Sequence, residues 1–128
     1  MAKTPTKTVL VSSAANTSGS TTRGRIDLSA ADGGHVTVRM TNGGTGPSAQ
    51  CVARILVSHA TSLPSAAAEG TGDDDWKMVR EIGGGLTANL STRGRFVFGP
   101  EVRHLEVEFT GNTSQSVTVE AICTSYAY

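Results

Sequence analysis

Long hydrophobic runs are missing from this 128-residue sequence. No apolar stretch approaches the roughly 20 residues that a membrane-spanning helix needs. The first apolar run, residues 9–11, is also too short for the hydrophobic core of a signal peptide. These absences argue against a membrane protein and predict that the chain folds in a cytoplasm.

An excess of charge of one sign is missing as well. Eleven basic residues balance eleven acidic ones, and only six residues are aromatic. A neutral chain has no overall field that attracts nucleic acid or an anionic membrane, and stacking on bases needs more aromatic side chains among basic ones. We therefore expect no nucleic-acid or membrane partner, although a neutral total charge does not exclude a local basic patch.

Cysteine and histidine are scarce too. Cys51 and Cys123 lie far apart and form no CxxC motif, and His35, His59 and His104 stand alone. No spacing typical of a metal centre or a bound cofactor is present. Both cysteines continue an apolar alternation, which indicates small core residues, and a disulfide between them requires neighbouring strands.

The residues that are abundant, Thr, Ser, Gly and Ala, suit short strands and turns. Apolar residues alternate with polar ones in residues 35–41 and 51–58, around a Gly/Pro-rich turn, and again in residues 104–109 and 117–124, around Gly111-Asn112. Shorter runs lie at residues 8–13, 25–28, 76–82 and 95–98. About eight strands at this spacing predict an all-β, antiparallel β-sandwich formed by residues 1–128 as one domain. The two long alternating pairs are expected to form hairpins.

A short sequence pattern that occurs twice supplies the first candidate site. Thr22-Arg23-Gly24-Arg25 resembles Thr92-Arg93-Gly94-Arg95. One interpretation is a strand start with a glycine bulge. The other is a pair of basic edges, Arg23 with Arg25 and Arg93 with Arg95, that meet an acidic or phosphate-bearing partner.

Acidic residues and the C-terminal tyrosines give the other candidates. Asp73, Asp74 and Asp75 lack the alternate spacing of a calcium loop, so a solvated loop or an electrostatic partner contact is favoured. Tyr126 and Tyr128 suit an oligomer contact or stacking on a sugar. No nucleophile elbow or phosphate-binding loop is present, which predicts a protein that is not an enzyme.

Carboxylates at alternate positions also stand out in the last two strands. Glu106 and Glu108 share one strand face, and together with Glu120 they are expected to form an acidic stripe on the wet face of the second hairpin.

Several segments resemble small virion proteins of tailed bacteriophages, namely capsid decoration (cement) proteins with a jelly-roll-like sandwich. The segments are KTVLV at 7–11, VRMTNGGTGP at 38–47, DWK at 75–77, HLEVEFTGNT at 104–113 and VTVEA at 117–121. The resemblance implies a homo-oligomer, with a trimer favoured, that binds the major capsid protein on the capsid exterior and stabilises the lattice. Residues 1–7 would then be an extended N-terminal arm across a neighbouring subunit.

Two other functions compete with this one. A carbohydrate- or receptor-binding module of a tail or fibre would use exposed aromatics, for which Trp76, Tyr126 and Tyr128 are the candidates, although a core position is favoured for Trp76. A head–tail assembly adaptor is the remaining alternative.

Overall fold

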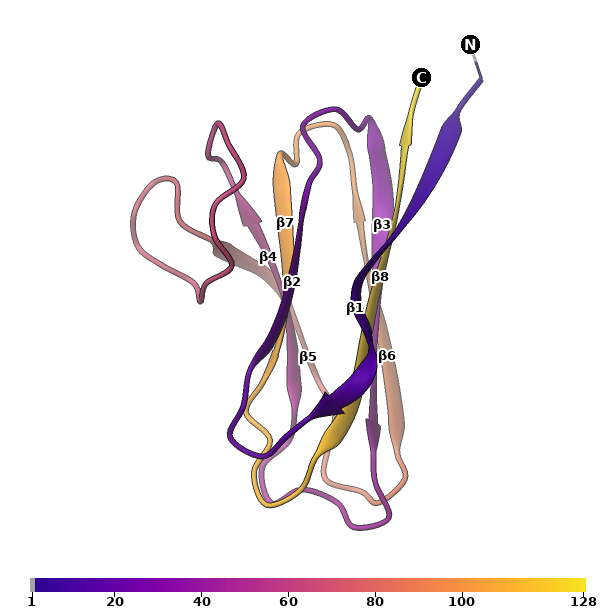
Figure 1. Cartoon of the computed structure of the whole chain (residues 1–128), viewed down its shortest axis with the longest axis vertical. Coiled ribbons are helices and arrows are strands. Elements are labelled where there is room, and N and C mark those ends of the chain that lie inside the picture. Colours follow the sequence, from indigo (N-terminus) through magenta and orange to yellow (C-terminus); the bar gives the residue numbers. More distant parts are fainter. Residues whose placement is uncertain (1) are drawn as a thin grey trace.

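The computed structural model describes residues 2–128 and contains eight strands (Figure 1). The strands are β1 (Thr4–Asn16), β2 (Thr22–Asp27), β3 (Gly33–Asn42), β4 (Val52–Ser58), β5 (Lys77–Gly83), β6 (Ser91–Phe98), β7 (His104–Thr110) and β8 (Val117–Ala127). This confirms the predicted all-β fold. No helix within the described residues is long and apolar enough to span a membrane.

The strands form two antiparallel four-stranded sheets that pack face to face. Sheet A has the order β1-β8-β3-β6, and sheet B has the order β2-β7-β4-β5. The chain crosses from one sheet to the other after almost every strand, and within residues 2–128 β4 and β5 are the one consecutive pair joined by hydrogen bonds. This order of strands is that of a jelly roll.

The two expected hairpins are therefore wrong. β3 pairs with β6 and β8, whereas β4 pairs with β5 and β7. β7 and β8 likewise lie in different sheets. Alternation specifies which face of a strand is buried and says nothing about its neighbour, so a Gly-rich turn between two alternating runs also suits a loop between sheets.

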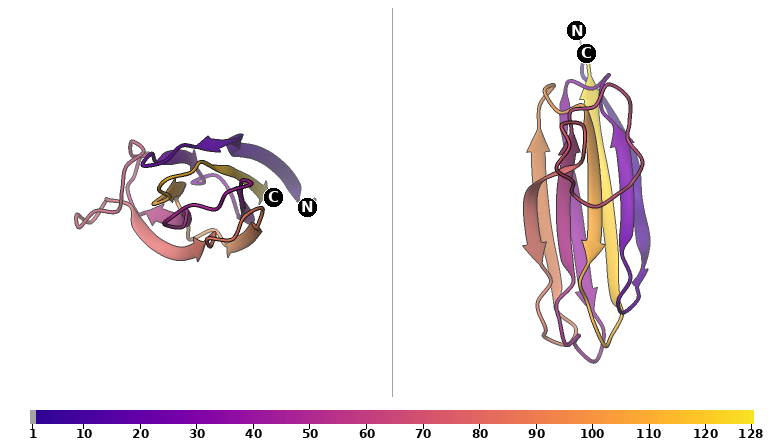
Figure 2. Two further views of the ribbon diagram at one scale, coloured as in Figure 1. Left: turned by 90° about the horizontal axis from the view of Figure 1, so that it is seen from below. Right: turned by 90° about the vertical axis from the view of Figure 1, so that its left-hand side faces the viewer.

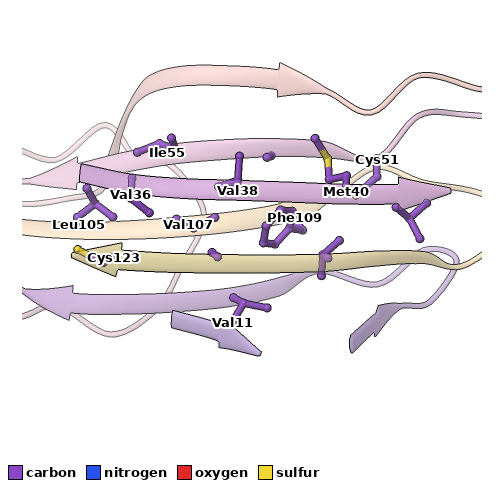
Figure 3. Packing of buried hydrophobic residues seen from close by; sticks show 14 of the residues in the cluster. Val11, Val36, Val38, Met40, Cys51, Ile55, Leu105, Val107, Phe109 and Cys123 are labelled. Atoms are coloured by element: carbon purple, nitrogen blue, oxygen red, sulfur yellow. The ribbon is translucent and has the colours of Figure 1, made fainter. Parts of the chain in front are cut away.

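The core lies between the sheets, where the predicted apolar positions point toward one another (Figure 3). Val36, Val38 and Met40 of sheet A face Val107 and Phe109 of sheet B, and all five side chains are buried. Cys51 and Cys123 are also buried, as predicted, with free thiols. Cys123 belongs to sheet A, while Cys51 precedes β4 in sheet B.

The predicted N-terminal arm is mostly part of this sandwich. Residues 4–7 belong to β1 and pair with Ala127, Tyr126, Ser125 and Thr124 of β8. Of the segment 1–7, Ala2 and Lys3 precede the strand, and Met1 lies outside the described residues. Most of the segment that was expected to cross a neighbouring subunit is therefore already paired with β8 of its own chain.

Residues 59–76 form a long loop between β4 and β5, called the covering loop below. It projects from the side of sheet B, opposite the outer face of sheet A (Figure 1). When sheet B faces the viewer, the loop lies across the front of its strands (Figure 2). One outer face of the sandwich is thus partly covered and the other is open.

Candidate interaction surfaces

The structure separates the two Arg-Gly-Arg segments. Arg23 and Arg25 lie in β2, which is the edge strand of sheet B beside β1. Arg93 and Arg95 lie in β6, which is the edge strand of sheet A beside β5. The two pairs occupy different sheets on opposite edges of the sandwich, so they do not form one site.

The glycines of these segments are close-packing positions and not bulges, because the register of β2 and β6 runs without a shift. A Cβ atom at Gly24 would lie 2.2 Å from the carbonyl oxygen of Leu10 in β1. A Cβ atom at Gly94 would lie 2.0 Å from Cδ1 of Ile82 in β5. Each glycine therefore lets the edges of the two sheets approach each other closely.

The outer face of sheet B carries charges that neutralise one another. Arg23, Glu108, Arg54 and Glu81 lie side by side on β2, β7, β4 and β5. Glu108 is buried and lies 3.0 Å from Nη2 of Arg23 and 3.8 Å from Nη1 of Arg54, and Nε of Arg54 lies 3.1 Å from Glu81. Opposite charges directly across strands stabilise a sheet. Arg23 is therefore part of this ladder of alternating charges and is not a free basic edge.

The next row of sheet B anchors the covering loop. Glu106 is fully buried, and its Oε1 accepts a hydrogen bond of 3.0 Å from the backbone N–H of Ala67. Burial raises the pKa of this carboxyl to about 7, against the lowering effects of the Ala67 hydrogen bond and the nearby Arg23. Arg25, the strand neighbour of Glu106, donates to the carbonyl oxygen of Pro64 in the loop.

Two further side chains fasten this loop. His104 is fully buried, and its Nε2 donates to the carbonyl oxygen of Ala60 over 3.0 Å. Trp76 is 2% exposed and donates from Nε1 to the carbonyl oxygen of Ser65. Trp76, which was interpreted as a core residue, is indeed buried, but it lies at the end of the covering loop and outside the cluster between the sheets.

The acidic run lies at the end of the covering loop. Asp73, Asp74 and Asp75 are exposed. Oδ2 of Asp75 accepts from the N–H of Gly72, and Nζ of Lys77 donates to the carbonyl oxygens of Gly70 and Gly72. No group of three metal-ligating side chains occurs in residues 2–128. Asp73 and Asp74 therefore present their carboxylates to solvent on a projecting loop.

The expected acidic stripe does not exist, because its members lie on different sheets. Glu106 and Glu108 are buried on the outer side of sheet B, whereas Glu120 lies on the outer face of sheet A. Glu120 is 3.6 Å from Nη2 of Arg39, and Arg39 lies directly opposite Arg93 of β6. The polar face of β7 is thus buried, with Glu108 paired to Arg23 and Arg54 and Glu106 hydrogen-bonded to the N–H of Ala67.

The outer face of sheet A is open and mostly basic. A shallow hollow of about 480 Å³ is lined by Thr37, Arg39, Arg93, Arg95 and Glu120 together with the backbone beneath them. No ion pair within the described chain involves Arg93 or Arg95. Arg93 and Arg95 are therefore exposed cations without an internal ion pair, whereas Arg23 pairs with Glu108 and Arg25 donates to the carbonyl oxygen of Pro64.

The C-terminal tyrosines border the same face. The Tyr126 and Tyr128 rings meet edge to face with centroids 5.8 Å apart, and Nζ of Lys3 lies 4.7 Å from the Tyr126 centroid. Tyr126 also lines a second hollow, of about 280 Å³, which shares Arg95 with the first. Tyr126 and Arg95 are thus brought to one surface, which sequence alone did not predict.

Comparison with protein-family models finds no match, and comparison with the curated protein sequences finds none either. The fold is similar to that of a chain of the T13 IBDV viral particle, with a TM-score of 0.55, 11% identity, and coverage of 98% of this chain and 31% of that chain. It is also similar to the K3 adhesin domain of Lys-gingipain from Porphyromonas gingivalis, with a TM-score of 0.51, 11% identity, and coverage of 80% of this chain and 63% of that one. The chain spans less than two thirds of either protein, and at this identity the similarity establishes the β-sandwich fold alone.

Proposed function

We propose that this protein is a non-enzymatic structural component of a phage particle that binds the capsid lattice and stabilises it as a decoration protein. The observation that carries the proposal is the asymmetry of the jelly roll. On the outer side of sheet B, the covering loop and a row of internal ion pairs supply partners for the charged side chains. The outer face of sheet A, in contrast, stays broad, shallow and open. Shallow, exposed faces of this kind suit contact with another protein.

Two further findings support the proposal. The sequence segments described above resemble decoration proteins of tailed phages, and a chain of a viral particle shares the fold over 98% of this chain. A ligand of the assembled shell stabilises that shell by mass action. The proposed partner is the major capsid protein, and the proposed location is the capsid exterior, with the protein acting as a homo-oligomer for which a trimer is favoured.

Co-sedimentation tests this function. Capsids of the phage that encodes the chain, assembled without it, are mixed with increasing amounts of purified protein and pelleted. The proposal expects saturable binding at a fixed ratio to the capsid subunits, and decorated capsids that withstand heat better than bare ones. Protein that stays in the supernatant at every concentration overturns the proposal.

A receptor- or carbohydrate-binding module is the second candidate. Tyr128 is 66% exposed and meets the ring of Tyr126 edge to face, and Tyr126 borders a hollow, so aromatic rings that suit sugar binding lie on the open face. Trp76 is buried and unsuited to this role. A glycan array tests the candidate: binding that Tyr126→Ala and Tyr128→Ala abolish would favour it over the capsid role.

A further inference from the structure

The charges of this neutral chain are separated between its two sides. The outer face of sheet A, called the basic face below, carries Lys7, Arg39, Arg93 and Arg95, with Lys3 beside Tyr126 at its border, and Glu120 as its carboxylate. The covering loop carries four exposed carboxylates, those of Glu69, Asp73, Asp74 and Asp75. Equal totals of acid and base therefore conceal a basic side and an acidic loop that face in opposite directions (Figure 1).

The basic face carries more positive charge than its own carboxylate neutralises, because Glu120 pairs with Arg39 and leaves Arg93 and Arg95 without an ion pair within residues 2–128. Arg39 and Arg93 are directly opposite each other on neighbouring strands, and Arg95 lies two residues further along the same strand face. Like charges directly across strands destabilise a sheet. Sheet B avoids this by alternating the signs of its charges, as in the row from Arg23 to Glu81, so the arrangement in sheet A indicates a surface whose counter-charges come from outside.

Apolar side chains lie among these cations. Val9 of β1 is 49% exposed and Val97 of β6 is 64% exposed, and both point to the same side as Lys7 and Arg95. Arginine combined with exposed apolar side chains is typical of the contact regions of protein partners. The covering loop offers a matching composition, because the exposed Ala66, Ala67 and Ala68 precede Glu69.

We infer that the basic face binds the acidic covering loop of a second copy of this chain, with Asp73 and Asp74 of one copy against Arg93 and Arg95 of the other. Asp73 and Asp74 form no ion pair within residues 2–128, and neither do the two arginines, so all four charges are available. The contact is heterologous, since it joins different surfaces of the two copies. It leaves one free face and one free loop at the ends, and copies add until the series closes into a ring or continues as an array. This inference specifies a contact for the homo-oligomer of the proposed function and rests on that part of it, but its test uses no capsid, so self-association and capsid binding can fail separately.

Sedimentation of the purified full-length protein over a wide range of concentrations tests the inference. At low ionic strength, the average mass is expected to rise with concentration above that of the 13.2 kDa chain. At about 1 M salt, where the Debye length is roughly 3 Å, it is expected to return to the monomer value. A protein that is monomeric at every concentration in low salt overturns the inference.

Two double variants identify the surfaces. R93E/R95E and D73K/D74K are each expected to abolish the concentration-dependent rise in mass, while an equimolar mixture of the two associates again. The mixture restores the contact because the unchanged loop of the first variant meets the unchanged basic face of the second.

R80E/R103E is the matched control for R93E/R95E, because it changes the net charge by the same amount at exposed positions outside both surfaces. Fluorescence of Trp76 reports whether each variant is folded. Association that survives both double variants, or a mixture that stays monomeric, overturns the inference, since the first outcome places the contact elsewhere and the second excludes pairing of face with loop.

Discussion

Replacing Glu106 with glutamine is expected to stabilise the protein at pH 8 and to change its stability much less at pH 5. Glu106 is fully buried beneath the covering loop, and burial raises the pKa of its carboxyl from 4.5 to about 7. The unfolded chain therefore releases this proton at a lower pH than the folded chain does. As a result, the free energy of unfolding falls as pH rises from about 4.5 to about 7 and is flat above that range.

The size of the effect follows from the shift in pKa. One pKa unit corresponds to about 1.4 kcal/mol, so the shift of Glu106 corresponds to about 3 kcal/mol in total, most of it lost between pH 5 and pH 8. Glutamine stays neutral at every pH and keeps an oxygen to accept the N–H of Ala67. It thus reproduces the protonated acid, and the E106Q variant is expected to lack this part of the pH dependence.

Urea unfolding at pH 5 and pH 8 measures the difference. Trp76 is the sole tryptophan, and it is buried and hydrogen-bonded to Ser65 within the covering loop, so its fluorescence reports on this region. Glu101→Gln is the matched control, because it removes one exposed carboxylate and is expected to leave the pH dependence unchanged. An equal loss of stability between the two pH values in the wild type and in E106Q would refute the argument.

Three other outcomes are expected. Gly24→Ala should lower the free energy of unfolding by about 1–3 kcal/mol, because the added Cβ atom would meet the backbone oxygen of Leu10. Gly43→Ala is the control and should leave the free energy of unfolding unchanged, since the space around Gly43 is open. Thermal unfolding compares the two variants. Glu108→Ala should cost about 1–3 kcal/mol by leaving two arginines without their buried carboxylate, and Glu81→Ala should cost less than about 1 kcal/mol because that pair is exposed; urea unfolding separates the two. The two cysteine thiols, whose pKa burial raises to about 11, should react with a thiol reagent only when the protein unfolds, and rapid labelling of the folded protein would contradict this.

The sequence correctly predicted which face of each long strand is buried, because a strand with one buried face alternates apolar and polar residues. The alternation of Val36, Val38 and Met40, and that of Leu105, Val107 and Phe109, correctly identified the core. Alternation carries no information on pairing, however, so both expected hairpins were assigned to the wrong neighbours.

The candidate site was predicted only in part. The repeated Arg-Gly-Arg pattern does lie on two edge strands, β2 and β6. The polar face of β7, however, was expected to be exposed to water, and it is buried. One signal was available: Arg23 and Arg25 have the same spacing as Glu106 and Glu108, as expected if two strands pair opposite charges. The roles of Arg39 and Lys7 depend on which strands are neighbours, and no local pattern contains that information.

The place of the last two strands has a consequence for how the chain folds. β8 lies between β1 and β3, and β7 lies between β2 and β4, so the last two of the eight strands occupy the interior of both sheets. Until β7 and β8 have been synthesised, β1 and β2 lack their hydrogen-bonded partners, and the β4–β5 hairpin is the main pairing that is local in sequence. Topologies dominated by distant contacts fold slowly. Neither sheet can therefore be completed before β7 and β8 are synthesised, and removal of residues from β8 would take away part of the centre of sheet A.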